Sequence, residues 1–312
     1  MFRIGLVDID VSHPGAFAVR MAEAGLPMRY THLVNRGFRG EDEVAGFAKT
    51  NGVTVLSSIE EMAEVTDVGF IQSCNWEKHL KAAMPYIERG KPVFLDKPLV
   101  GSVADVRRVR ELSEAGAVIY GSSSARYAPE LGEFLARPVE ERGEVLHVFV
   151  SAGVDEFNYG IHAAEILGRL AGAPALSCRY AGRSETRDGR YAETFFATFQ
   201  NGVSGTYTLC TGQWQPFEVS ILTTKTSESF RIDSSRIYTA LLVNLAAALE
   251  GKENELATVG EITDNVLMML AGKVSRERGG ETVRLADLPA EAAFDGDLFE
   301  RGYAATAPKI YL

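Results

Sequence analysis

The feature that most constrains the fold is an alternation of short apolar runs with longer amphipathic segments over residues 1–122. Parallel strands need long crossover connections, usually helical, so this alternation is typical of a parallel sheet with helices on both faces. Strands are predicted at Arg3–Val7, Tyr30–Val34, Val68–Gln72, Val93–Leu95 and Ala117–Tyr120. Helices are predicted at Ala16–Ala24, Glu41–Asn51, Ser58–Val65, Glu77–Arg89 and Ser102–Gly116, the last with Ser102 as its N-cap.

From about Gly143 the pattern changes to strands in succession, which predicts a mostly antiparallel open sheet. These strands are predicted at Glu144–Ser151, Ala175–Ala181, Ala192–Phe199, Val203–Thr211, Phe217–Thr224 and Ser229–Ile232. Helices are predicted at Tyr159–Leu170, Tyr238–Glu250 and Glu261–Arg278. The expected fold class is α/β, with a Rossmann-type domain at residues 1–122 and an open-sheet α+β domain at residues 123–312. The cleft between the domains is the expected site.

The composition limits the kinds of partner and the cellular compartment that we expect for this chain. The chain has 312 residues, 46% of them hydrophobic, and a formal charge of −10, which disfavours nucleic acid and anionic membranes as partners. Its three cysteines are widely spaced, so we expect neither disulfides nor a zinc site, and a cytoplasmic location. No apolar stretch is long enough to span a bilayer. The scattered histidines form no metal-binding pair, so no metal is expected.

The turn after the first strand carries acidic residues where a dinucleotide-binding loop has glycines. Asp8 and Asp10 stand at the first two glycine positions and His13 near the third. A carboxylate facing a pyrophosphate is electrostatically unfavourable unless it points away or is compensated. Ser12 and His13 at a helix start can replace the glycine amides as anion contacts, or Asp10 and Ser12 can simply cap the helix, with Pro14 in its first turn.

The end of the second strand bears on the choice of cofactor. Asn35 and Arg36 replace the acidic residue that binds a ribose diol. Arg36 together with Arg39 can accept a 2′-phosphate, which slightly favours NADP over NAD. An equally simple interpretation is a solvated pair of surface arginines.

Three further segments identify a family. The first is Gln72-Ser73-Cys74-Asn75-Trp76-Glu77-Lys78-His79, the second Asp96-Lys97-Pro98, and the third Asn158-Tyr159-Gly160-Ile161-His162-Ala163-Ala164-Glu165. Together they resemble the Gfo/Idh/MocA family of NAD(P)-dependent oxidoreductases. The resemblance covers nearly the whole chain and implies a sugar, cyclitol or similar polyol as substrate.

The resemblance also implies roles for the residues that match. Lys97 would lie close to the nicotinamide and the substrate hydroxyl, and His162 would be the general acid–base. Asn158 replaces the usual aspartate. It stands four residues before His162 at a helix start, so the two are expected to share a face and meet one substrate, with Asn158 as a third catalytic residue. The candidate cofactor-binding residues are Asp8, Asp10, Ser12, His13, Asn35, Arg36, Cys74, Asn75, His79, Asp96 and Lys97. The candidate substrate-binding residues are Glu165, Tyr127, Arg126 and Tyr159. Trp214 can stack on a sugar ring or serve as a core or subunit-contact aromatic.

The leading interpretation is an NAD(P)-dependent enzyme that transfers a hydride to or from a hydroxyl-bearing carbon. Two alternatives stay open, which are a lyase or glycosidase that uses bound NAD transiently and a non-catalytic member that binds a ligand or partner. Asp8, Asp10 and Asn158 favour the last. An uncovered face of the second sheet predicts a homodimer or homotetramer.

Overall fold

The N-terminal sheet is entirely parallel, as predicted. The computed structural model describes residues 1–308. Six strands lie in the order β3-β2-β1-β4-β5-β6. Their bounds are β1 (Phe2–Val7), β2 (Met28–Val34), β3 (Thr54–Val55), β4 (Val68–Ile71), β5 (Val93–Leu95) and β6 (Ile119–Gly121). Of these six strands the sequence analysis missed β3, because two residues show no periodicity.

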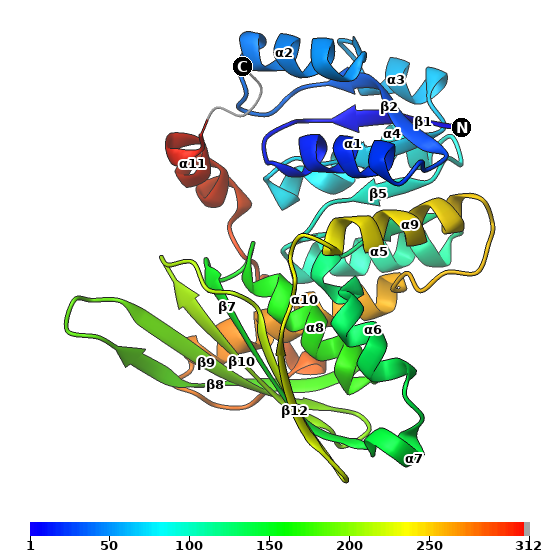
Figure 1. The fold of residues 1–312 in the computed structure, drawn as a ribbon. Helices are drawn as coiled ribbons and strands as arrows, with labels where there is room; N and C mark the ends of the chain where they lie inside the picture. The colour runs from blue at the N-terminus through cyan, green and yellow to red at the C-terminus, as the bar shows by residue number, and fades with distance from the viewer. Residues whose placement is uncertain (309–312) are drawn as a thin grey trace.

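Helices cover both faces of this sheet (Figure 1). They are α1 (His13–Glu23), α2 (Glu41–Asn51), α3 (Ile59–Val65), α4 (His79–Ile87) and α5 (Val103–Glu114). Phe17 of α1 and Phe47 of α2 belong to one buried cluster, whereas Tyr86 of α4 and Val106 of α5 belong to the other. The Ser102 hydroxyl accepts a hydrogen bond from the Asp105 amide, which confirms the predicted N-cap of α5.

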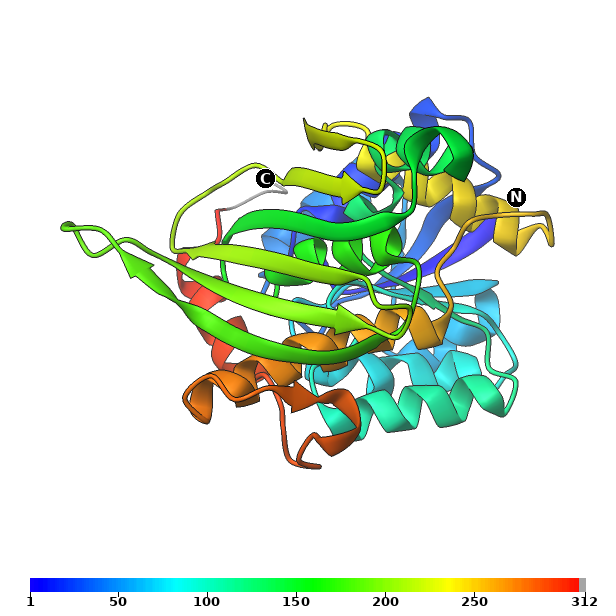
Figure 2. The same ribbon diagram turned by 90° about the horizontal axis from the view of Figure 1, so that it is seen from below.

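The second sheet has seven strands in the order β12-β11-β7-β10-β9-β8-β13. Their bounds are β7 (Val145–Val154), β8 (Ala175–Glu185), β9 (Tyr191–Phe199), β10 (Ser204–Thr211), β11 (Glu218–Thr223), β12 (Ser227–Arg231) and β13 (Val283–Arg284). The pair β7 and β10 is parallel and every other pair is antiparallel, so the predicted α+β domain is confirmed. Helices α8 (Gly160–Ala171) and α10 (Val259–Glu277) pack on one face. Figure 2 shows the opposite face uncovered.

Two helices of the later chain return to the N-terminal domain. Helix α9 (Ile237–Leu249) packs on α1, and its Leu245 joins the same core cluster as Phe17. Helix α11 (Gly296–Thr306), which the sequence analysis did not predict, lies beside the ends of β1 and β2 (Figure 1). The remaining elements are α6 (Pro129–Ala136), α7 (Val139–Arg142) and three short 3-10 helices, η1 (Trp76–Lys78), η2 (Ser124–Tyr127) and η3 (Leu285–Asp287). The domain limits at 122 and 123 stay a prediction. Among residues 1–308, no helix combines the length and the apolar character needed to cross a membrane.

Candidate functional site

A cavity of about 180 Å³ opens where the carboxyl ends of the N-terminal strands face the second domain. Its lining comes from the start of α1, the segment after β5, the start of α8, the loop after β10 and the start of α9. The residues that line it are Ser12, His13, Lys97, Tyr159, His162, Trp214, Gln215, Pro216, Phe217, Ser234, Ile237 and Tyr238. Of the predicted site residues outside the loop after β1, three line this cavity, namely Lys97, Tyr159 and His162. The contribution of α9 was not predicted.

Lys97 is held at the base of this cavity by the segment before α8. Its Nζ donates to the Asn158 carbonyl at 3.1 Å and to Asn158 Oδ1 at 2.7 Å. The ammonium also lies 5.5 Å from the centre of the Tyr159 ring. Burial lowers the pKa of Lys97, while the charge of Asp96 opposes that shift. The amine is therefore both fixed in position and easier to deprotonate than a lysine in water.

His162 lies on the first turn of α8. Its Nδ1 is 2.5 Å from Ser123 Oγ, and its ring packs between those of Tyr159 and Phe217. Burial, aided by the nearby charge of Lys97, lowers the pKa of His162 well below its ordinary value. The imidazole is thus neutral at neutral pH, and because Ser123 engages Nδ1, the nitrogen left for a bound molecule is Nε2.

Asn158 lies outside the helix that carries His162. It precedes α8, which begins at Gly160, so the helical spacing does not apply. Its side-chain amide donates to Asp155 at 3.2 Å, and its side-chain oxygen accepts from Lys97. Asn158 therefore positions the lysine rather than the histidine.

A second histidine faces the cavity from the start of α1. His13 Nδ1 lies 2.7 Å from Asp96 Oδ2, and both side chains are nearly inaccessible to solvent. Asp96 also accepts from Gln72 Nε2 at 3.2 Å and from the Lys97 amide at 2.7 Å. Burial raises the pKa of Asp96, but His13 and Lys97 outweigh that effect and lower it to about 2. Asp96 is therefore an ionised carboxylate that orients the His13 ring.

The two aspartates of the altered loop point into the protein. Asp8 has a left-handed backbone, with φ of 65°, and its carboxylate accepts from the amides of Arg36 at 2.5 Å and Gly37 at 2.9 Å, and from the Ser73 hydroxyl. Asp10 accepts from the amides of Phe38 and Cys74, both at 3.1 Å. These bonds tie the end of β1 to the loops after β2 and β4.

Both carboxylates are costly to ionise in this position. Burial raises the pKa of Asp8 despite its three hydrogen-bond donors. Burial, together with the charge of Asp8, raises the pKa of Asp10 to about 7. The interpretation that Asp10 and Ser12 cap α1 is wrong, because Asp10 binds other loops and Ser12 makes no side-chain cap, although Pro14 does lie in the first turn.

Helix α11 lies over these loops. Lys78 Nζ binds Glu300 Oε2 at 2.6 Å, and Asn75 Nδ2 donates to Asp297 at 2.7 Å and to Glu300 at 3.1 Å. The rings of Phe299 and Trp76 are 5.2 Å apart. Beyond the helix, the Pro308 carbonyl accepts from Arg39 at 2.7 Å.

Comparison with known proteins relates part of the N-terminal domain to a known family. A sequence model described as an oxidoreductase family with an NAD-binding Rossmann fold matches residues 15–122. Residues 15–122 thus match the Gfo/Idh/MocA family model, in agreement with the resemblance seen in the sequence. The match begins directly after the altered loop. No curated protein matches the chain.

Solved structures share the fold across both domains. A scyllo-inositol dehydrogenase from Lactobacillus casei has a TM-score of 0.74 at 13% identity and covers 92% of this chain and 98% of its own. GenD2 from gentamicin A biosynthesis, in complex with NAD, has a TM-score of 0.74 at 17% identity and covers 91% and 96%. An oxidoreductase from Thermotoga maritima has a TM-score of 0.73 at 19% identity and covers 92% and 99%. At these identities the likeness shows the fold alone.

The arrangement described above does not fit the dinucleotide of a Gfo/Idh/MocA Rossmann domain. Such a cofactor lies at the carboxyl ends of the strands, with its pyrophosphate on backbone amides at the start of the first helix. Here Asp8 and Asp10 occupy the amides of the neighbouring loops, and α11 covers the same edge. Arg39, the expected partner of a 2′-phosphate, is buried and binds the Asp10 carbonyl, Glu43 and the Pro308 carbonyl instead. Arg36 is exposed.

Other residues that were predicted to bind the cofactor form hydrogen bonds within the protein. Both ring nitrogens of His79 bond to backbone carbonyls, those of Leu99 at 3.0 Å and Ser73 at 2.9 Å. Asn35 donates to the Arg39 carbonyl at 3.1 Å. These side chains fix the loops of the strand ends, and a direct role in binding a cofactor stays a prediction for each.

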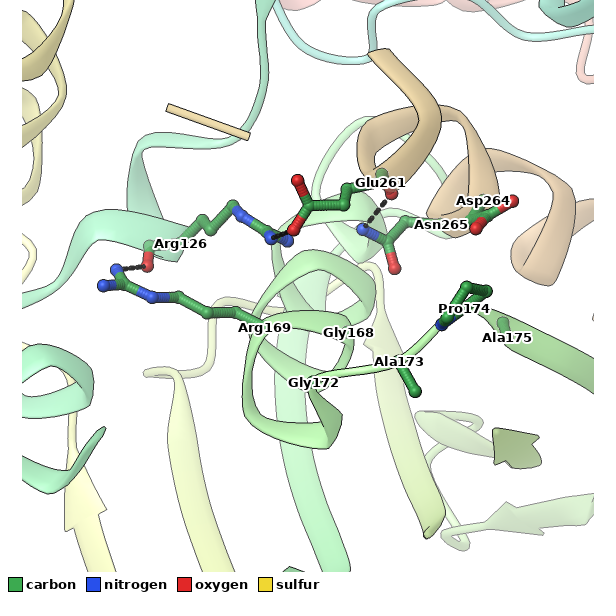
Figure 3. Close-up of a pocket in the computed structure, with 10 residues that line it drawn as sticks. All are labelled: Arg126, Gly168, Arg169, Gly172, Ala173, Pro174, Ala175, Glu261, Asp264 and Asn265. Atoms are coloured by element: carbon green, nitrogen blue, oxygen red, sulfur yellow. Dashed lines mark hydrogen bonds and ion pairs between the residues drawn. The ribbon is translucent and has the colours of Figure 1, made fainter. Parts of the chain in front are cut away.

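The expected substrate residues around η2 lie outside the cavity. The Tyr127 hydroxyl accepts from the Ala257 amide at 3.0 Å, and Glu165 accepts from the Ser123 amide at 2.8 Å. Arg126 pairs with Glu261 at 2.8 Å and lines a separate cavity of about 180 Å³ between α8 and α10 (Figure 3). Of the four residues predicted to bind substrate, Tyr159 is the one that lines the cavity of Lys97 and His162.

Asp10, Cys74 and Glu300 bring potential ligand atoms within 4.8 Å of one another, in the described part of the chain. Lys78 already neutralises Glu300, and burial raises the pKa of the Cys74 thiol. A metal prefers a thiolate and free carboxylate oxygens. The cluster is better explained as the contact between α11 and the loops beneath it.

Proposed function

We propose that this chain is an enzyme of the oxidoreductase family that acts on a hydroxyl-bearing carbon of a sugar, cyclitol or similar polyol bound beside Lys97 and His162. The observation that carries the proposal is the convergence of Lys97, His162 and His13 on one cavity, each fixed by a different neighbour. The cavity of about 180 Å³ is smaller than the sites that hold drug-sized ligands, so it favours a small molecule such as a monosaccharide or an inositol.

The residues of this chain account for the proton half of such a reaction. The neutral His162 can accept the proton of a substrate hydroxyl at Nε2, since Ser123 holds its other nitrogen. The Lys97 ammonium can donate a hydrogen bond to the same oxygen and stabilise the developing negative charge. His13, oriented by the ionised Asp96, supplies a second acid–base group on the side of α1.

Polar and aromatic groups on the other wall support a polyhydroxylated ligand. Ser12 and Ser234 offer hydroxyl groups, and Tyr238 and Trp214 offer ring faces or hydrogen-bond donors. Trp214 is 71% exposed, so its ring is available for stacking at the mouth of the cavity. The scyllo-inositol dehydrogenase with the same fold is consistent with a cyclitol as one candidate ligand.

A second candidate function is ligand binding without redox chemistry. It is favoured by Asp8 and Asp10, whose buried carboxylates occupy the amides where a dinucleotide would be expected to lie. The same cavity would then bind a polyol, or act on it by proton transfer alone. Reduction of added NAD or NADP in proportion to polyol consumed separates the two functions.

Ligand binding is tested by saturation-transfer NMR with scyllo-inositol, myo-inositol, D-glucose and D-gluconate. The expected result is a signal from at least one polyol that is lost in Lys97→Met and in His162→Asn. His147→Gln, which changes a histidine of β7 outside the cavity, is the matched control and should keep the signal. Absence of signal from all four polyols, or a signal unaffected by both cavity variants, would contradict the proposal.

A further inference from the structure

Two histidines face the cavity of Lys97 from different parts of the fold. His13 begins α1, beside the first sheet, and His162 lies in the first turn of α8, on the second sheet (Figure 1). The ring of His13 stacks on that of Phe17, with 5.7 Å between the ring centres, and packs edge-on against that of Tyr238 at 5.4 Å. Both imidazoles are therefore fixed on the walls of one cavity.

Each of the two histidines is bound at Nδ1 and free at Nε2. His13 Nδ1 lies 2.7 Å from Asp96, and because that carboxylate is ionised, Nδ1 carries the hydrogen of this bond. Ser123 engages Nδ1 of His162. Neither Nε2 atom has a hydrogen-bond partner within residues 1–308. Both nitrogens are therefore available to take a proton from a bound molecule or to return one.

Lys97 brings a positive charge and a spare hydrogen-bond donor to the same cavity. Its ammonium has three N–H groups, and in the described part of the chain its two bonds to Asn158 leave one of them for a ligand. No carboxylate is among the side chains that line the cavity within residues 1–308. The cavity therefore favours a substrate oxygen that becomes negatively charged during the reaction.

The groups in this cavity are suited to a reaction that needs no dinucleotide. The ends of β1, β2 and β4 do not fit NAD(P), because Asp8 and Asp10 occupy the loop amides there. A histidine can take a proton from carbon when the electron pair left behind moves onto an adjacent carbonyl oxygen. The spare N–H of Lys97 can stabilise the resulting enolate. A second histidine can then return a proton to the same carbon, so one C–H bond breaks, another forms, and no electrons leave the substrate.

We propose that this cavity epimerises a polyhydroxylated ketone, either a ketose or a keto-cyclitol, at the carbon beside its carbonyl group, with His13 and His162 as the two acid–base groups. The inference rests on the polyol site proposed above and adds an activity that uses no dinucleotide. In one direction His162 removes the proton and His13 adds one, and in the reverse direction the two exchange roles. Asp96 carries the counter-charge whenever His13 is protonated.

The test follows the exchange of carbon-bound hydrogen in deuterium oxide by proton NMR, with no dinucleotide added. The probes are D-fructose, its epimer D-psicose, and scyllo-inosose. Wild type should incorporate deuterium beside the carbonyl and form the epimer faster than His162→Asn by about 100-fold or more. In His13→Asn, whose amide can donate to Asp96 in place of the ring, epimer formation should fall by about as much, whereas exchange from one of the two ketoses should persist. His147→Gln, outside the cavity, is the matched control and should keep both rates.

Exchange that is no faster than in buffer for all three probes would overturn the epimerase. So would a folded His13→Asn variant that keeps epimer formation or loses exchange from both ketoses. The saturation-transfer experiment on the same samples separates this inference from the proposed function. Polyol binding that depends on Lys97 and His162, without any exchange, would reject the epimerase alone. Exchange without reduction of added NAD or NADP would support the epimerase and reject hydride transfer, and the loss of both binding and exchange would reject the substrate site itself.

Discussion

Glu165 is a buried carboxyl group whose replacement by glutamine should change how stability depends on pH. It is 1% exposed on α8, where Oε1 accepts from the Ser123 amide and Oε2 has no hydrogen-bond partner among residues 1–308. Burial, only partly offset by Arg126, raises the pKa of Glu165 from its ordinary value of 4.5 to about 8. The folded protein therefore keeps this proton over a pH range in which the unfolded chain has lost it.

The sign and the size of the effect follow from that difference. Between pH 4.5 and about 8 the native state binds the extra proton, so the free energy of unfolding falls as pH rises. The slope from this one group is about 1.4 kcal/mol per pH unit, which sums to roughly 5 kcal/mol as an upper bound. Glu165→Gln cannot ionise, so the variant should lack this slope and become steadily more stable than wild type as pH rises.

The measurement is urea unfolding of wild type and Glu165→Gln at pH 5, 6, 7 and 8, followed by tryptophan fluorescence. Glu23→Gln, at an exposed position of α1, controls for the loss of one carboxylate. A difference in unfolding free energy between wild type and Glu165→Gln that is the same at pH 5 and pH 8 would show that Glu165 is ionised in the fold, and the reasoning would fail.

Three further variants test other parts of the structure. In Gly37→Ala the new Cβ would lie 1.9 Å from Asp10 Oδ1, so the melting temperature should fall, whereas Gly40→Ala, with no atom within 4 Å, should leave it nearly unchanged. Asp96→Asn should lower the free energy of unfolding at pH 7 by roughly 2 kcal/mol, because the fold lowers the pKa of Asp96 from 3.8 to about 2. The stabilisation by the ionised Asp96 is fully present above pH 3.8 and is lost as the pH falls through 2. Trp214→Ala should weaken polyol binding in NMR titrations without changing the melting temperature, since the side chain is 71% exposed.

Sequence patterns predicted most of the fold, because the spacing of apolar residues along a short segment indicates whether it forms a helix or a strand. The spacing of Val103, Val106, Val109 and Leu112 is that of a helix with one buried face, and all four are buried in α5. Helix α11 gave no comparable signal. Its inward side chains are only half-buried, and their partners Lys78 and Phe38 lie more than 200 residues away in the chain.

The sequence predicted which residues line the candidate site better than it predicted their hydrogen-bond partners. Lys97, His162 and Tyr159 do line one cavity. The direction of the Asp8 and Asp10 side chains could not be predicted, because their hydrogen-bond donors are backbone amides of the loops after β2 and β4. Every residue except proline has a backbone amide, so the amino-acid type does not show which amide donates to a carboxylate. The pairing of His13 with Asp96 likewise joins positions 83 residues apart.

The buried carboxylates of the altered loop decide what this edge of the sheet can bind. Asp8 and Asp10 are at most 2% exposed and hold the loops together, so removing them would leave buried amides without acceptors. A dinucleotide at this edge of the sheet would meet Asp8 and Asp10 in place of glycine amides. The altered loop is therefore the feature of this chain that most disfavours a bound pyrophosphate.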